Sequence, residues 1–145
     1  MGKASYSIEV KNPVEHVFKF LDDSDLAKQW IGGLESIEPL TAGGNRVGAK
    51  AKHIYVEDGR KIEMIEETLI YEPNKRVKIK GVTDGFELSV DYRLQATPTG
   101  TRIDYEAETH MTSLMMKILA PLINWSNRKR VAEDFARLKA LVEGS

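Results

Sequence analysis

Residues 12–40 have the sequence NPVEHVFKFLDDSDLAKQWIGGLESIEPL, and their pattern decides the fold. Asn12 can cap a helix, and Pro13 suits the first helical position because the N–H of that position has no partner in a helix. Glu15 stands where it can complete a capping box. Apolar residues then recur at helical spacing, at Val14, Val17, Phe18 and Leu21. This stretch therefore predicts a short helix with one buried stripe.

A second short helix is expected directly after the first, from Ser24 through Trp30. Gly32 and Gly33 should end it, because glycine readily adopts the left-handed conformation found at helix C-termini. Upstream, residues 3–11 alternate loosely between apolar and polar side chains and predict a strand. The chain therefore begins with a strand that is followed by two short helices.

The middle of the chain predicts six further strands. Turn signals rich in glycine, proline, asparagine and aspartate separate the segments, and connections this short imply antiparallel neighbours. The alternation is cleanest in the last two segments, where one face is mainly apolar and the other mainly charged. The strands are expected near 34–41, 48–57, 60–72, 75–83, 86–97 and 101–111.

The last segment returns to helical spacing. Pro121 should interrupt it, because proline lacks an N–H and clashes with the preceding turn. A short turn is expected before this proline and a long helix after it, ending near Gly144. One broad face of the long helix then carries Trp125, Arg128, Ala132, Phe135 and Val142.

This order predicts an α+β protein that forms a single domain over residues 1–145. A curved antiparallel sheet of about seven strands has one apolar face, which it must bury against the long C-terminal helix. Because long sheets twist, this sheet is expected to wrap around that helix.

Composition excludes several classes of function. The 145 residues carry a formal net charge of −1, which gives no attraction to nucleic acid or to an acidic membrane. There is no cysteine, so disulfides and thiol nucleophiles are excluded. The longest apolar-rich run, 114–125, is too short to span a bilayer, and the N-terminus lacks the apolar core of a signal peptide. Stable membrane insertion is therefore not expected. A cytoplasmic location is expected.

Three segments carry a resemblance to a known family. They are residues 12–40, the stretch ETLIYEPNKRVKIKG at 67–81, and the C-terminal helix after SLMMKILAPLINW. The chain resembles the helix-grip fold of the START/Bet v 1-like (SRPBCC) superfamily, and most closely its bacterial polyketide cyclase/dehydrase-like branch. The resemblance covers nearly the whole chain and implies a ligand cavity between the sheet and the long helix.

The segment GAKAKHIYVEDG, residues 48–59, bears on that cavity. Its lysines require water, so the inward face should consist of Ala49, Ala51, His53 and Tyr55. Two alanines in place of leucines leave roughly 150 Å³ unfilled, which costs about 3 kcal/mol in a solid core. The small side chains on this inward face therefore favour a pocket beside the strand. The alternative is that Trp125 or Met115 fills the space left by the two alanines.

His53 and Glu66 are the candidate catalytic residues. His53 can act as a general acid or base, or donate a hydrogen bond to a ligand. The alternative is a histidine satisfied by a neighbouring strand or by water. Glu66 and Glu67 are adjacent, so one faces inward in a regular strand, but neither parity is clearly apolar and a bulge can change the outcome. The sequence does not choose between them.

Arg128 could pair with an inward glutamate or hold an anionic group of a ligand, and the alternative is that it extends into solvent at the helix edge. The tyrosines could supply hydroxyl groups to the pocket, or they could be core residues. The full set of expected ligand contacts is Ala51, His53, Tyr55, Met64, Thr68, Leu88, Tyr92, Tyr105, Met115, Trp125 and Arg128.

Neither a metal site nor a cofactor is expected. His16, His53 and His110 are far apart and show no ligand spacing. The Gly-rich stretch GGNRVGAK lacks the Gly-Lys-Ser/Thr of a phosphate loop and precedes no helix.

Two functions from different classes follow. The first is binding of a small hydrophobic or amphipathic molecule, such as a lipid, an isoprenoid or an aromatic or polyketide-like metabolite. The second is a cyclase or dehydratase-like enzyme in which His53 or Glu66 moves a proton. A protein-binding module of chaperone-activator type shares the fold and would have a filled interior. The sequence leaves open the ligand, any catalysis, a homodimer, and whether residues 111–121 form a lid.

Overall fold

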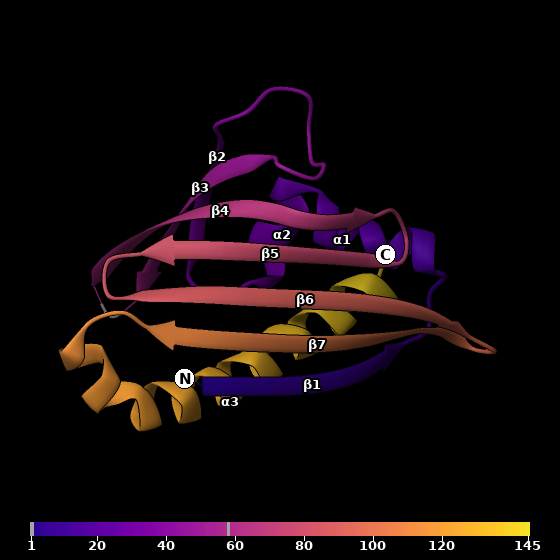
Figure 1. Cartoon of the computed structure of the whole chain (residues 1–145). Helices are drawn as coiled ribbons and strands as arrows, with labels where there is room; N and C mark the ends of the chain where they lie inside the picture. Colours follow the sequence, from indigo (N-terminus) through magenta and orange to yellow (C-terminus); the bar gives the residue numbers. More distant parts are fainter. Residues whose placement is uncertain (1, 58) are drawn as a thin grey trace.

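The computed structural model describes the backbone of residues 2–57 and 59–145, and the side chains of residues 3–56, 59–114 and 128–145. Figure 1 shows the arrangement of the elements. In chain order they are β1 (Gly2–Val10), α1 (Val14–Asp22), α2 (Ser24–Trp30), β2 (Leu34–Pro39), β3 (Lys50–Glu57), β4 (Arg60–Glu72), β5 (Arg76–Thr83), β6 (Phe86–Thr97), β7 (Gly100–Met111) and α3 (Leu114–Glu143).

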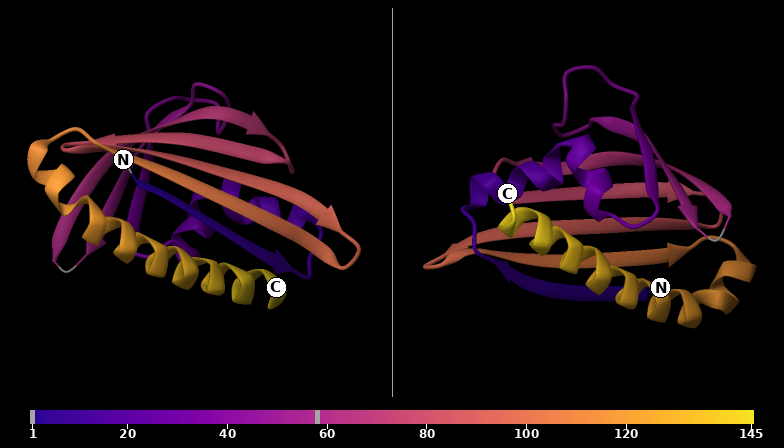
Figure 2. Two further views of the ribbon diagram at one scale, coloured as in Figure 1. Left: turned by 60° about the horizontal axis from the view of Figure 1, so that its bottom comes forward. Right: turned by 180° about the vertical axis from the view of Figure 1, so that it is seen from behind.

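The strands form one seven-stranded sheet in the order β1-β7-β6-β5-β4-β3-β2. Every neighbouring pair is antiparallel, and each strand from β2 to β6 pairs with the next strand in the chain, as the turn signals predicted. The first strand instead pairs with the last. The sheet is curved, and all three helices lie on the same side of it (Figure 2). The predicted α+β helix-grip fold is therefore confirmed.

The start of α1 differs from the prediction. Pro13 rather than Asn12 is the N-cap residue, with an extended backbone and no side-chain capping bond. The carbonyl of Pro13 accepts from the N–H groups of His16 and Val17, so the helix begins one residue later than expected. The side-chain oxygen of Asn12 is buried without a hydrogen-bond partner among the described residues. The predicted capping box is wrong because Pro13 takes the capping position itself.

The predicted break at Pro121 is also wrong, because α3 is continuous from Leu114 to Glu143. In Figure 2 its first turns run at an angle to the remainder. Proline costs a helix one hydrogen bond and bends it, and a bend need not end the helix.

An aromatic cluster fixes the helices on the sheet. The ring of Phe135 on α3 lies 5.5 Å from that of Tyr6 on β1, 5.3 Å from Tyr105 on β7 and 5.6 Å from Trp30 on α2. Trp30 is buried, and its indole N–H donates to the carbonyl of Phe20 over 2.8 Å. Burial of rings this large supplies much of the hydrophobic stabilisation of a small core.

Polar contacts hold α3 against the end of α2. The carboxylate of Asp134 accepts from the Gly32 N–H over 3.0 Å and from Arg137. Arg130 donates to the Gly32 carbonyl and Arg137 to that of Trp30. Burial raises the pKa of Asp134, although these donors oppose that effect. The turn that follows α2 is therefore fixed from the helix side.

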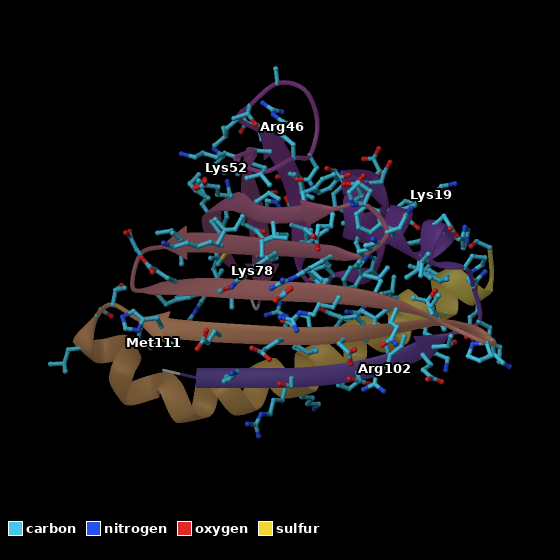
Figure 3. All side chains as sticks on the ribbon, turned by 45° about the vertical axis from the view of Figure 1, so that its right-hand side comes forward. Lys19, Arg46, Lys52, Lys78, Arg102 and Met111 are labelled. Carbon is cyan, nitrogen blue, oxygen red and sulfur yellow. The ribbon has the colours of Figure 1, made fainter. Side chains whose placement is uncertain are left out.

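The outward face of the sheet is charged, and Figure 3 shows Lys52, Lys78 and Arg102 projecting from it. On this face Arg76 makes two hydrogen bonds to Asp91, of 3.0 and 2.8 Å. On the opposite face the buried Val77, Leu94 and Ile103 pack in the core with the helices, as alternation predicts, although Ile65 and Val82 remain exposed on the outward face.

Candidate functional site

A pocket of about 890 Å³ lies between the helices and the inner face of the sheet. One side is formed by α1 and α2, the opposite side by strands β2 to β6, and the rim by residues of the 41–49 segment. Among the α3 residues whose side chains the structure describes, 114 and 128–143, none belongs to this lining, and its described helical side consists of α1 and α2. This volume falls within the range of pockets that take small organic ligands.

The inner wall combines apolar side chains with small ones. Trp30, Ile79 and Val90 supply apolar surface, while Ala49 and Ala51 leave room on the β3 side. The alternating segment around β3 thus turns its alanines toward a space that no side chain of the described part of the chain fills. A filled core would have required larger residues at these two positions.

Glu66 is the glutamate that faces inward. It lies opposite Ala51 on β3, on the same face as the buried Met64 and Thr68. A register shift follows between Thr68 and Ile70, so the inward parity changes beyond it. This bulge explains why the sequence pattern of β4 favoured neither face. Glu67 occupies the opposite parity, on the outer face, in register with Lys80 on β5 and with Lys50 at the start of β3, which also reaches the pocket rim.

Three polar side chains meet at the pocket wall. The Tyr55 hydroxyl donates to Glu66 Oε2 over 2.9 Å, and His53 Nδ1 lies 3.0 Å from the same oxygen. The side chains of His53 and Glu66 are only 15% and 12% exposed. Burial, and then the adjacent Glu66 carboxylate, raise the pKa of Tyr55 far above its ordinary value. Tyr55 therefore stays protonated and acts as a donor to Glu66.

Tyr92 supplies a further hydroxyl to the pocket lining. Its hydroxyl makes no hydrogen bond to another residue of the described part of the chain. Burial raises its pKa well above the ordinary value, and the neighbouring Tyr105 and Glu66 add to this effect. The ring of Tyr105 lies 5.4 Å away but does not line this pocket. Tyr92 thus adds a neutral phenol to the pocket wall.

The rim is held by a chain of hydrogen bonds that sequence reasoning missed. Thr68 donates to Asn45 Oδ1 over 2.7 Å, and Asn45 donates in turn to Asp22 over 3.2 Å. The Tyr71 hydroxyl donates to the other oxygen of Asp22 over 3.1 Å. These bonds tie the Gly-rich segment to α1 and β4. Asn45 stands within that segment, but no local pattern indicates partners so distant in sequence.

The other expected ligand contacts have different positions. Met64 is buried beside the wall, and Leu88 is half-buried away from the described lining. Arg128 is exposed, whereas Arg130, two residues further along α3, donates to the Gly32 carbonyl. The side chains of Met115 and Trp125, and those of residues 115–121 in the segment considered as a lid, lie outside the part of the chain whose side chains the structure describes.

Among the described residues, no group of three or more histidine, aspartate or glutamate side chains is arranged to hold a metal ion. Within the same residues, no helix combines the length and the apolarity needed to cross a membrane.

Comparison with known proteins gives a family match and a set of similar structures. The model of the family described as "Polyketide cyclase / dehydrase and lipid transport" matches residues 1–143. A comparison with curated protein sequences finds no match.

Several solved structures are similar over nearly their whole length. TTHA0849 from Thermus thermophilus has a TM-score of 0.79 at 17% identity, covering 97% of this chain and 96% of that one. CV1439 from Chromobacterium violaceum has a TM-score of 0.76 at 17% identity, covering 98% and 97%. Ara h 8.0201 has a TM-score of 0.72 at 15% identity, covering 99% and 98%. At these identities the likeness shows a shared fold.

Proposed function

This chain belongs to the polyketide cyclase/dehydrase and lipid transport family, and we propose on that premise that it binds a small hydrophobic or amphipathic molecule. The ligand occupies the pocket between α1, α2 and the sheet. The observation that carries the proposal is this pocket of about 890 Å³, with alanines where a filled core would need larger residues. An isoprenoid, a lipid or an aromatic metabolite suits it in size.

Affinity would come mainly from apolar burial. Each Å² of apolar ligand surface removed from water contributes about 25 cal/mol, less the cost of restricting the ligand. Trp30, Ile79 and Val90 would provide the apolar contacts, while His53, Glu66 and Tyr92 would orient a polar group. Sites for small organic ligands typically combine an apolar wall with a small number of polar groups that orient the ligand.

A pocket-filling substitution tests this function. Ala51→Trp places an indole in the pocket and should abolish binding of an uncharged fluorescent probe, N-phenyl-1-naphthylamine. Lys52→Trp, one residue along on the outer face, is the matched control and should bind the probe as the unmodified protein does. Circular dichroism checks that both variants fold. Equal probe binding by Ala51→Trp and the unmodified protein would show that the ligand site lies elsewhere.

The contact of His53 with Glu66 favours a second candidate, a cyclase or dehydratase-like enzyme. Glu66 would take a proton from the carbon beside a carbonyl, and His53 would hold the Glu66 carboxyl group in place during this transfer. The Tyr92 hydroxyl would donate a hydrogen bond to the oxygen of the developing enolate. Turnover of a poly-ketone substrate should then fall at least about a hundredfold in both Glu66→Gln and His53→Ala. Turnover that survives both substitutions would remove these residues from the reaction.

The other expectations from the sequence stay predictions. They are a cytoplasmic location, a homodimer as an open alternative, and the absence of a nucleic-acid partner. Sedimentation of the purified protein, with and without the probe, would give its oligomeric state.

A further inference from the structure

The charges around the pocket restrict the chemistry of its ligand. We propose that the pocket selects an apolar molecule whose polar group donates hydrogen bonds, a protonated amine or a hydroxyl, over the analogue that carries a carboxylate. This inference rests on the proposed ligand-binding function and names the ligand class of that same site.

The charged groups of the inner wall centre on one carboxylate. Glu66 lies inside, and its partners are the Tyr55 hydroxyl at 2.9 Å and His53 at 3.0 Å, both at Oε2. With Glu66 ionised, the three side chains together carry one negative charge when His53 is neutral, and none when His53 is protonated. In neither protonation state of His53 do these three side chains carry a net positive charge that would attract a ligand carboxylate.

The rim adds negative rather than positive charge. Asp22 faces the pocket, and its oxygens accept hydrogen bonds from neutral groups of Asn45 and Tyr71. These neutral donors stabilise the Asp22 carboxylate but do not neutralise its negative charge. Asp23 also lines the rim and accepts from two backbone N–H groups of α2.

Cations around the pocket do not reverse this balance. Lys19 and Lys50 belong to the lining, against the carboxylates of Asp22, Asp23 and Glu66, while the carboxylate of Asp25 is paired with Lys28 over 3.4 Å. Arg130, on α3, is not part of the lining; its guanidinium donates to the Gly32 carbonyl beside Asp134, and its charge also acts on Tyr55. Among the described lining residues, acidic side chains thus still outnumber basic ones.

Hydrogen-bonding capacity points the same way. Glu66 is an acceptor, and a ligand ammonium or hydroxyl can donate to it, whereas a ligand carboxylate would place one acceptor against another. The Tyr92 hydroxyl lies in the same lining and can accept from the ligand group as well. Because the Glu66 side chain is only 12% exposed, its charge is weakly screened and discriminates strongly between a ligand ammonium and a ligand carboxylate.

A matched ligand series tests the proposal. Decylamine, decan-1-ol and decanoate have the same apolar chain and differ in the head group, and each is titrated at about pH 7 against N-phenyl-1-naphthylamine bound to the full chain. We expect decylamine to displace the probe at a concentration at least about tenfold below that of decanoate, with decan-1-ol in between. Amide shifts of Ala51 in nuclear magnetic resonance spectra show that each ligand occupies the pocket.

Two glutamine variants separate the local charge from the net charge of the protein. Glu66→Gln should reduce the preference for the amine to less than about threefold, whereas Glu67→Gln, which changes the same charge on the outer face, should preserve it. The ranking in the unmodified protein is a test by itself, so the proposal does not depend on the folding of a variant.

The outcomes are distinguishable. Decanoate binding as tightly as decylamine, or equal effects of Glu66→Gln and Glu67→Gln, would overturn the proposed ligand class while leaving ligand binding intact. Failure of the probe and of all three ligands to shift the Ala51 amide would refute the proposed function, and this inference with it.

Discussion

Replacing Arg76 by alanine is expected to destabilise the fold in a strongly pH-dependent way. Arg76 Nε and Nη2 donate to the two oxygens of Asp91, and the side chains are 29% and 11% exposed. After the substitution, Asp91 retains Arg93 at 3.2 Å, but that side chain is 62% exposed and binds weakly. Because hydrogen bonds to a charged group contribute about 1.5–3 kcal/mol, we expect a loss of about 2 kcal/mol at pH 7.

The pH dependence follows from the carboxyl group. Burial alone would raise the pKa of Asp91, but the hydrogen bonds and charge of Arg76, with a smaller effect of Arg93, lower it below the ordinary 3.8. A lowered pKa in the folded state gives stability that is complete above the pKa of the unfolded chain and is lost as the pH falls through the folded value. The cost of Arg76→Ala should therefore shrink steadily below about pH 4.

Urea unfolding followed by circular dichroism measures this cost at pH 7 and at pH 3 in four proteins: unmodified, Arg76→Ala, Asp91→Asn and the double variant. The interaction of the pair is the part of the cost that disappears in the Asp91→Asn background. An equal cost of Arg76→Ala at both pH values, or an undiminished cost when Asp91→Asn is already present, would refute the reasoning. The loss would then come from packing of the arginine side chain.

Two glycine substitutions add the same methyl group in different surroundings, and urea unfolding measures both. In Gly100→Ala the new Cβ meets the carbonyl oxygen of Val10 and lies 2.9 Å from Lys11 Cα; because backbone must move, we expect a loss of about 3 kcal/mol or more. In Gly81→Ala the Cβ meets the Met64 thioether, which is flexible, so a loss of about 1 kcal/mol is expected. Equal losses would contradict this distinction between backbone and side-chain neighbours.

Local patterns were sufficient to predict most of the fold. The turn signals lie between the observed strands, and α2 spans Ser24–Trp30 as its flanking residues indicated. Such signals act over a few residues, which is the range at which propensity and turn chemistry operate. The prediction failed where two local rules competed: Pro13 displaced Asn12 as the cap, and α3 continued past Pro121.

The site depended on longer-range information. The alternation around β3 indicated that Ala51 and His53 face inward, and both line the pocket. Whether Glu66 or Glu67 joins them depended on the bulge after Thr68, which follows from pairing with β5 and leaves no clear mark in the sequence. The role of Asn45 at the rim likewise needs partners on α1 and β4.

The pairing of β1 with β7 sets an order of events when the protein is made. β1 pairs with residues 101–109, so its backbone has no partner in the sheet until these residues, about a hundred positions later in the chain, have left the ribosome. The hairpins from β2 to β7 join near neighbours and can form early, whereas closure by β1 requires a long loop and should be slow. Phe135 on α3 packs on β1 and on Trp30 of the pocket wall, and it is translated later still. The core behind the binding site is therefore completed only after α3 has been made, and truncation within α3 should yield a protein that aggregates through the uncovered apolar face of its sheet.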